Sequence, residues 1–227
     1  NKLLNGATVD NEILAVELGL EKIVDDQTFS LRLDQSFRIA TLDEQVTYPA
    51  PAFTATDTPI SPQKGNSVEL GWKSGATQTT IYYLENNDEI YYDPASFTNT
   101  TVDKTRRYGA SYGTDLNVTS SIKVSMSGSY TYAKFDDAAY DGSHVPSTSG
   151  YLGSLKFKKT ISGQWSVDML SRFQSAQYSI NDWSNIYGKR NAHSVTNLNV
   201  SHTGKFFSSK LTIGNLFGKK YDSYHLR

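Results

Sequence analysis

The residues of this sequence that most often carry out chemistry are scattered along the chain. Histidine, the commonest metal-binding side chain, occurs at His144, His193, His202 and His225. A zinc site needs ligands at close spacing, which these positions do not provide. The sequence has no cysteine, which excludes thiolate ligands and disulfide bonds. The acidic residues of one loop depart from the ligand spacing of a calcium-binding EF-hand; they are Asp136, Asp137 and Asp141. We therefore predict no metal site and no cofactor.

Residues suited to nucleophilic or acid–base catalysis also fail to form a group. Asp141, Ser143 and His144 share one loop, and local neighbours in a loop do not make a catalytic triad. Asp88 and Glu89 are adjacent in a predicted strand, so their side chains should point to opposite faces and cannot share a proton transfer. No phosphate-binding or dinucleotide-binding glycine motif is present. We expect that the protein is not an enzyme.

Binding of an anionic ligand is a more promising chemistry. Arg38 and Arg172 fall on the polar side of predicted strands, where they could attract an anionic ligand or pair with carboxylates. Aromatic side chains in or near predicted loops could cradle such a ligand or pack within the loops. The candidate ligand-binding residues are Arg38, Tyr48, Tyr91, Tyr92, Arg172 and Trp183.

The elements that must position these residues are β-strands. In residues 121–135, SIKVSMSGSYTYAKF, every second residue is apolar, small or aromatic, and the residues between them in the first part of the run are polar. Strict alternation of this kind predicts a strand with one apolar and one polar face. The same pattern recurs along the chain and predicts about ten strands. They lie near 12–23, 28–38, 67–74, 78–94, 107–117, 121–135, 151–159, 164–178, 195–203 and 208–218.

The connections between these strands alternate in length. Tight breaks are expected at 25–27, 74–77, 117–121, 160–163 and 203–208, and long polar loops at 39–66, 95–105, 136–150 and 180–194. All the long loops then fall at one end of an up-and-down meander, as in outer-membrane barrels. Aromatic residues cluster near that end, where an aromatic girdle would lie. Basic pairs such as Arg106–Arg107 are simplest to place at the barrel rim, near lipid headgroups.

Composition excludes several classes of protein. The 227 residues carry a formal net charge of −1, so nothing indicates nucleic-acid binding. The mean hydropathy is −0.49, and no run approaches the roughly 18 apolar residues that a membrane helix requires. Aromatic residues make up 12 % of the chain and include 15 tyrosines, which suit a boundary between apolar and aqueous surroundings. An all-β, antiparallel, up-and-down transmembrane barrel fits all of these features.

Short motifs along the chain resemble those of the TonB-dependent outer-membrane receptor family. They occur in order over residues 12–224, which is nearly the whole chain. The quoted pieces are SFR (36–38), LDE (42–44), SPQK (61–64), VELGWK (68–73), NDEI (87–90), TRRYG (105–109), YTY (130–132) and GNLFGKKY (214–221). Gln63 stands where the family usually has Glu. Each piece is short, and the order and spacing of the set carry the resemblance.

The resemblance implies a 22-stranded barrel closed by an N-terminal plug, which imports scarce nutrients across the bacterial outer membrane with energy from TonB. Residues 1–227 are then expected to be the C-terminal portion of that barrel, without the plug, the first barrel half and the last strand. The expected cargo is a ferric siderophore or a similar metal chelate. The expected partners are the TonB complex, reached through the plug, and the lipid and lipopolysaccharide of the outer membrane.

Two other functions fit the strand pattern alone. One is a soluble β-rich ligand-binding module, which would bury its apolar faces in a protein core. The other is a different outer-membrane barrel of the porin type. Whether the apolar face is covered by protein separates the first alternative from a membrane barrel.

Overall fold

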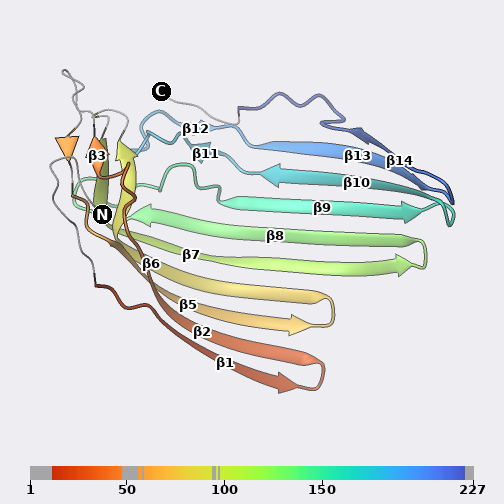
Figure 1. Ribbon diagram of the computed structural model, residues 1–227, viewed down its shortest axis with the longest axis horizontal. Coiled ribbons are helices and arrows are strands. Elements are labelled where there is room, and N and C mark those ends of the chain that lie inside the picture. The colour runs from red at the N-terminus through yellow and green to blue at the C-terminus, as the bar shows by residue number, and fades with distance from the viewer. Residues whose placement is uncertain (1–11, 48–55, 58, 94–95, 97, 223–227) are drawn as a thin grey trace.

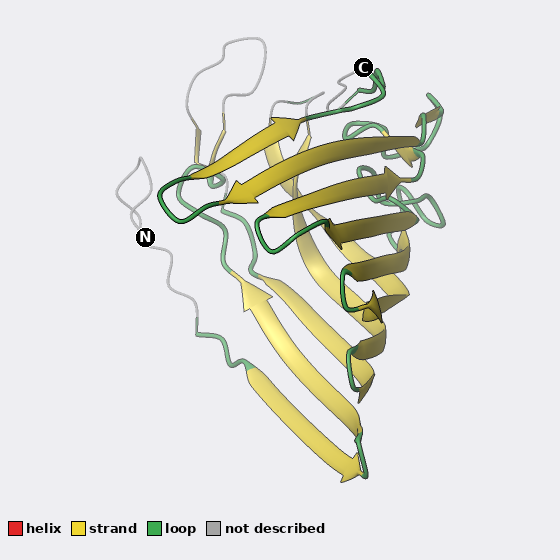
Figure 2. Cartoon of the chain, turned by 90° about the vertical axis from the view of Figure 1, so that its right-hand side faces the viewer, coloured by secondary structure: helices red, strands yellow, loops and turns green. Residues whose placement is uncertain are grey.

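One curved antiparallel sheet organises the computed structural model, which describes residues 12–47, 56–57, 59–93, 96 and 98–222. Ten strands pair in the order β1-β2-β5-β6-β7-β8-β9-β10-β13-β14, so neighbours in the sheet follow one another along the chain. The tight turns lie at one end and the long connections at the other (Figure 1). The sheet curves around without closing (Figure 2). No helix among the described residues has the length and hydropathy needed to cross a bilayer.

The ten strands correspond to the ten runs expected from the alternation. Their bounds are β1 Val16–Val24, β2 Gln27–Arg38, β5 Gln63–Ser74, β6 Thr77–Asp93, β7 Thr98–Thr119, β8 Ile122–Phe135, β9 Tyr151–Thr160, β10 Trp165–Gln174, β13 His193–Thr203 and β14 Ser208–Ile213. Two short hairpins lie at the end of the sheet that carries the long connections. They are β3 (Val46–Thr47) with β4 (Thr56–Asp57), and β11 (Gln177–Tyr178) with β12 (Lys189–Arg190).

The strand register aligns the apolar residues of successive strands into rows. One row crosses seven strands and consists of Leu20, Leu31, Leu70, Ile81, Ala110, Tyr130 and Tyr151. We call this surface the apolar face and the opposite surface the polar face. Leu20, Leu70 and Ile81 are 57 %, 54 % and 57 % exposed, so no part of the described chain covers them. A soluble module would bury such a continuous face, so this exposure favours a membrane barrel over the soluble alternative.

Tyrosines form a belt on the apolar face, near the long connections. Tyr83, Tyr108 and Tyr132 stand opposite one another in β6, β7 and β8, and the rings of Tyr108 and Tyr132 stack with centroids 5.0 Å apart. Tyr130 and Tyr151 pair in the next row, with ring centroids 5.1 Å apart. Tyrosine suits a level where hydrocarbon meets headgroups. We call these five residues the tyrosine belt.

The polar face carries small and charged side chains. Arg32 and Lys123 form ion pairs there with Glu17 and Asp115, at 2.8 Å and 2.9 Å. Pairs this exposed contribute little to stability. The charges instead mark the face that stays in contact with water or polar protein, because an uncompensated ion in a lipid-facing position is costly.

The alternation of β6 shifts by one residue at Asp88. Its φ of 53° lies in the left-handed region, which Asp tolerates better than most residues. Asn86 and Glu89 would lie on opposite faces of a regular strand, yet Asn86 Nδ2 donates to Glu89 Oε2 over 3.2 Å. The regular alternation of faces that the sequence predicts for this strand is therefore interrupted at Asp88. The shift brings Glu89 and Tyr91 to the side on which Arg107 lies.

Several predicted boundaries differ from the structure, and three of the differences are instructive. Residues 98–105 belong to β7 rather than to a loop, because the β-branched side chains of the threonine-rich run favour the strand. The predicted strand 164–178 breaks after Gln174, and Gln177–Tyr178 pairs with β12. The last predicted strand ends at Ile213, and Leu216 N then bonds back to Thr196 O over 2.7 Å.

Substitution of Ile81 by Arg tests whether the apolar face contacts lipid. A cation at mid-depth on the lipid face should cost about 2–4 kcal/mol of barrel stability, because the hydrocarbon cannot solvate it. Ser111→Arg, on the polar face one register step away, should cost less than about 1 kcal/mol. Both losses of stability are measured by unfolding the native protein and each variant in urea. The folded fraction is read from heat modifiability, the difference in gel migration between the folded and the heat-denatured barrel. Equal losses would contradict the assignment of the faces.

Candidate functional site

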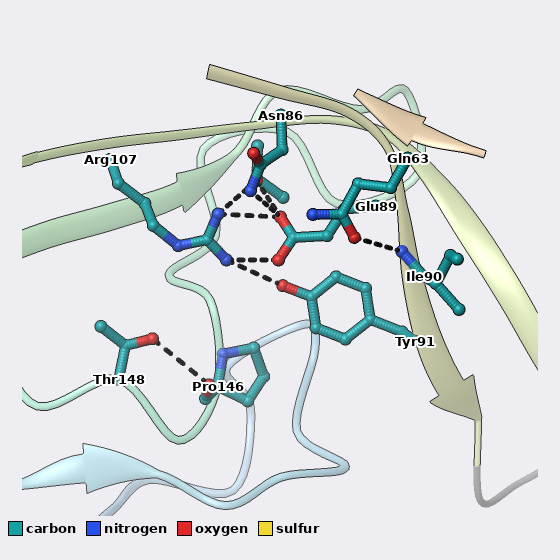
Figure 3. Close-up of polar contacts among 9 residues, drawn as sticks. Gln63, Asn86, Glu89, Ile90, Tyr91, Arg107, Pro146 and Thr148 are labelled. Carbon is teal, nitrogen blue, oxygen red and sulfur yellow. Dashed lines mark hydrogen bonds and ion pairs between the residues drawn. The ribbon is translucent and has the colours of Figure 1, made fainter. Parts of the chain in front are cut away.

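A buried ion pair between Glu89 and Arg107 lies toward the end of β6 and the start of β7, near the long connections, which we call the outer end of the sheet. Arg107 lies on the polar face, and Figure 3 shows the contacts of the pair. Arg107 donates two parallel hydrogen bonds to the Glu89 carboxylate, over 2.8 Å and 2.7 Å. The two side chains are only 17 % and 13 % exposed. Thr105 also donates to Glu89, and Arg107 Nη2 donates to the Tyr91 hydroxyl over 3.1 Å. Each charge therefore has several partners, which a buried ion requires.

The surroundings of Glu89 keep its carboxyl group ionised. Burial raises the pKa of Glu89, but hydrogen bonds and the positive charge of Arg107 outweigh that effect and lower the pKa below its ordinary value. Burial also raises the pKa of the Tyr91 hydroxyl. The pair is thus permanently charged near neutral pH and serves as a fixed bidentate clamp between β6 and β7.

Four aromatic side chains pack beside this ion pair, and we call them the aromatic cluster: Tyr91, Phe135, Tyr140 and Trp183. The Trp183 ring centroid lies 5.5 Å from that of Tyr91, 6.1 Å from that of Phe135 and 5.3 Å from that of Tyr140. Val102, Ala133 and Val145 complete the buried core. The cluster joins β6, β7 and β8 to the connections that follow β8 and β10.

A second feature of the polar face is a pocket of about 800 Å³. Its polar lining comes from β8, β9, β10 and β13, and includes Ser129, Ser154, Arg172, Gln174, His193 and Asn197. The His193 ring stacks on Tyr221, with centroids 4.4 Å apart and planes 8° apart. Arg172 is exposed and forms no ion pair with another described residue. We call this the polar-face pocket; it offers a cation and several hydrogen-bonding groups to an anionic ligand.

The structure places the remaining candidate residues apart from the polar-face pocket. Arg38, at the end of β2, is bound to Glu44, whose carboxylate also accepts from Thr41 N over 2.8 Å. Tyr92 is 52 % exposed on the β6 end, whereas Trp183 is 8 % exposed within the aromatic cluster. Tyr48 lies outside the described residues. Tyr91 and Trp183 therefore lie together, while Arg38, Tyr92 and Arg172 stand separately.

No group of three or more histidine, aspartate or glutamate side chains among the described residues is arranged to hold a metal ion. The ion pair, the aromatic cluster and the polar-face pocket supply charge, hydrogen-bonding groups and aromatic surface.

The protein-family model described as "TonB dependent receptor-like, beta-barrel" matches residues 16–216. This chain belongs to the TonB-dependent receptor family. The ten-stranded sheet thus corresponds to part of a receptor barrel. In outer-membrane barrels the outward-facing side chains are apolar and the interior is polar. Comparison with curated protein sequences gave no match.

Solved structures of receptors and transporters share this fold. The ferric yersiniabactin uptake receptor FyuA from Yersinia pestis is similar with a TM-score of 0.75 at 15 % identity, over 94 % of this chain and 33 % of that one. The FrpB iron transporter from Neisseria meningitidis is similar with a TM-score of 0.74 at 14 % identity, over 97 % and 36 %. The copper transporter OprC has a TM-score of 0.71 at 19 % identity, over 91 % and 34 %. This receptor chain spans about a third of the length of each.

Sequence reasoning missed the ion pair of this receptor and left His193, which lines the polar-face pocket, out of the candidate ligand-binding residues. The sequence placed Arg106 and Arg107 together as charges at the barrel rim. In the structure only Arg106 lies on the apolar face, where it pairs with Glu85 and Asp136 at 3.3 Å and 2.6 Å. Arg107 lies two positions before Gly109 and four before Ser111, which are both on the polar face. The alternation of faces along the strand was therefore enough to place Arg107 on the polar face. No sequence signal places His193 against Tyr221.

Proposed function

We propose that the native protein is a TonB-dependent transporter of the bacterial outer membrane that imports a ferric siderophore or a similar metal chelate. The observation that carries this proposal is the match of nearly the whole chain to the receptor barrel family. Among the similar structures, one is a ferric yersiniabactin uptake receptor, one an iron transporter and one a copper transporter. A metal or a metal chelate is the kind of cargo that these proteins have in common.

We further propose that residues 1–227 form the C-terminal portion of a plugged, 22-stranded barrel. Two facts support this: the sheet has ten strands, and the chain spans about a third of the similar receptors. The TonB complex would act on the plug, and the ten-stranded sheet with its long connections would supply wall and outer loops.

Within this function, the polar-face pocket and the outer loops would contact the cargo. Arg172, which forms no ion pair within the described part of the chain, supplies a cation to an anionic chelate, and Tyr92 supplies an exposed ring at the end of the sheet that carries the long connections. Tyr91 and Trp183 would act indirectly, since their rings pack against one another and hold the loops in place. Arg38 would attract an anionic ligand only if that ligand competed with the Glu44 carboxylate for its guanidinium group.

Uptake by cells tests the proposal. Cells lacking the gene, complemented with the native protein, should take up a radiolabelled ferric siderophore, and uptake should vanish when TonB is also deleted. Arg172→Gln should weaken binding of the chelate roughly tenfold, the worth of a lost charge-assisted contact. Lys158→Gln, on the polar face near the tight turns, should change binding less than twofold.

Three results would each contradict a different part of the proposal. Uptake that persists without TonB would exclude the energy-coupled mechanism. Absence of uptake for every ferric chelate and for copper would exclude the cargo class. The purified protein should have a mass about three times the 25.2 kDa of this chain, as a barrel of some 22 strands requires; a mass near 25.2 kDa would overturn the plugged barrel.

A further inference from the structure

Basic side chains follow one another along the polar face of β9 and β10. Arg172 of β10 stands opposite Ser154 of β9, and Lys156 follows two residues later on β9, in the next row of the same face. Lys158 comes after two more residues, in the row that also contains Asp168. Each of these rows lies nearer the tight turns than the one before it. We call Arg172, Lys156 and Lys158 the cation ladder.

The three side chains of the cation ladder start from backbone positions that are close together. Lys156 and Lys158 lie two residues apart, about 7 Å along the strand, and Arg172 lies one row away on the neighbouring strand, about 5 Å across the sheet. The Debye length at physiological ionic strength is about 8 Å, so water and salt only partly screen one position from the next. An anion that leaves one cation is therefore already attracted by the next one.

Acidic neighbours do not neutralise the cation ladder. Its three side chains are exposed, and none of them forms an ion pair within the described part of the chain. The strands β8, β9, β10, β13 and β14 contain no acidic residue besides Asp168, whose Oδ1 accepts a hydrogen bond from Asn199 Nδ2 over 3.0 Å. Lys123 of β8 stands opposite Lys158 and pairs with Asp115 over 2.9 Å. This part of the polar face therefore carries a net positive charge.

The polar face of β1, β2 and β5 has the opposite balance of charge. Two of its basic residues are already bound to carboxylates, Arg32 to Glu17 and Arg38 to Glu44, and Lys73 is the third. The acidic residues of β1, β2 and β5 on this face are Glu17, Glu21, Asp34 and Glu69. An anion on the polar side of the sheet would therefore be drawn toward β9 and β10 and away from β1, β2 and β5.

The cation ladder starts at the polar-face pocket. Arg172 and Ser154 both line that pocket, whereas Lys156 and Lys158 do not. The two lysines lie between the pocket and the tight turn that joins β9 to β10 (Figure 1). A ligand bound in the pocket is thus in reach of the first cation, and the two lysines lead from there toward the tight turns.

We infer that the cargo is an anionic chelate and that it moves from the polar-face pocket toward the tight turns along the cation ladder. This inference rests on the proposed function, in which the polar face lines the interior of a transporting barrel. It adds the route along the wall and two residues, Lys156 and Lys158, that act on passage rather than on binding. A surface of one charge raises the local concentration of an oppositely charged ligand and its rate of encounter, whereas a neutral chelate gains nothing from it.

Uptake of three radiolabelled iron probes by cells that express the native protein tests the inference. The probes are ferric citrate and a ferric tris-catecholate, which are anionic, and a neutral ferric hydroxamate. At least one anionic probe should enter. In the double variant Lys156→Gln with Lys158→Gln, the maximal uptake rate of that probe should fall at least about tenfold. Its Kd, measured in cells that lack TonB, should change less than twofold. A neutral probe that also enters should do so at the native rate.

Two further double variants serve as controls. Lys156→Arg with Lys158→Arg keeps both charges and should restore the native uptake rate. Lys22→Gln with Lys159→Gln removes two cations from the apolar face near the tight turns and should leave the uptake rate unchanged. The amount of each variant in the outer membrane is measured by fractionation, so a loss of protein is not mistaken for slower passage.

Several results would overturn the inference. Uptake of the neutral hydroxamate alone would do so and would leave the proposed function standing. Native uptake of an anionic probe by the glutamine variant would exclude the route along the ladder. Uptake by that variant without TonB would show that the lysines hold the plug in place instead. If none of the three probes enters, the inference falls, whereas the proposed function falls only if copper and the other ferric chelates fail to enter as well.

Discussion

Glu89→Gln should destabilise the outer end of the sheet by about 3–5 kcal/mol, the usual cost of leaving one member of a buried ion pair without its partner. The amide cannot neutralise Arg107, whose side chain is 17 % exposed. Local opening should increase, and hydrogen exchange in residues 133–145 should speed up more than about a hundredfold. Mass spectrometry of peptides from the native protein in detergent measures this rate.

The effect of Glu89→Gln should depend on pH. Because the pKa of Glu89 in the folded protein lies below its ordinary value of 4.5, the ionised carboxylate stabilises the fold above that pH. The contribution is lost as the pH falls through the lowered pKa. The difference in hydrogen-exchange rate between the native protein and the variant should therefore be largest at pH 7. It should become smaller under strongly acidic conditions, where Glu89 is protonated.

Glu85→Gln is the matched control for this prediction. Glu85 belongs to the same strand and also has cationic partners, but it lies on the apolar face, and its side chain is 24 % exposed against 13 % for Glu89. Its pairs with Lys104 and Arg106 are closer to the surface, so the loss should stay near or below about 1 kcal/mol. Similar exchange rates in the two variants would show that the clamp on Arg107 has no special role.

Trp183→Ala should cost about 3–5 kcal/mol, as expected when a large aromatic side chain is removed from a packed core. Its ring touches three members of the aromatic cluster, and Ala would leave a cavity among them. The near-ultraviolet circular dichroism of the cluster should collapse, and protease should cut the connections after β8 and β10 faster. The barrel below should keep its strands.

Two other variants separate packing from hydrogen bonding. Trp183→Phe keeps an apolar ring and loses the bond from Nε1 to Ile180 O, which spans 3.2 Å, so it should cost only about 1 kcal/mol. Trp165→Ala removes a tryptophan that is 46 % exposed on the apolar face and should leave the loops unchanged. Protease resistance of Trp183→Ala equal to that of Trp165→Ala would contradict the packing role.

The regular part of this fold could be predicted from sequence because it rests on a local rule. In residues 121–135 each side chain has only two directions available, and polarity selects the face. The same rule puts Arg172 on the polar face. It fails at Asp88, where one left-handed residue exchanges the faces of the later residues of β6. It also cannot place Trp183, because the path of the connection after β10 depends on contacts with β6 and β8 that lie far away in the chain.

The aromatic cluster has a thermodynamic consequence for any ligand that reaches the outer loops. Side chains from three strands and two connections meet in one buried core, so these segments order together and open together. The conformational entropy of these segments is lost when the protein folds. A ligand that contacts one loop therefore does not have to order the other loops, and binding carries little further entropic cost. Affinity at this end of the receptor should then vary mainly with the contacts themselves. Mutations deep in the cluster should weaken the binding of chemically unrelated ligands by similar factors.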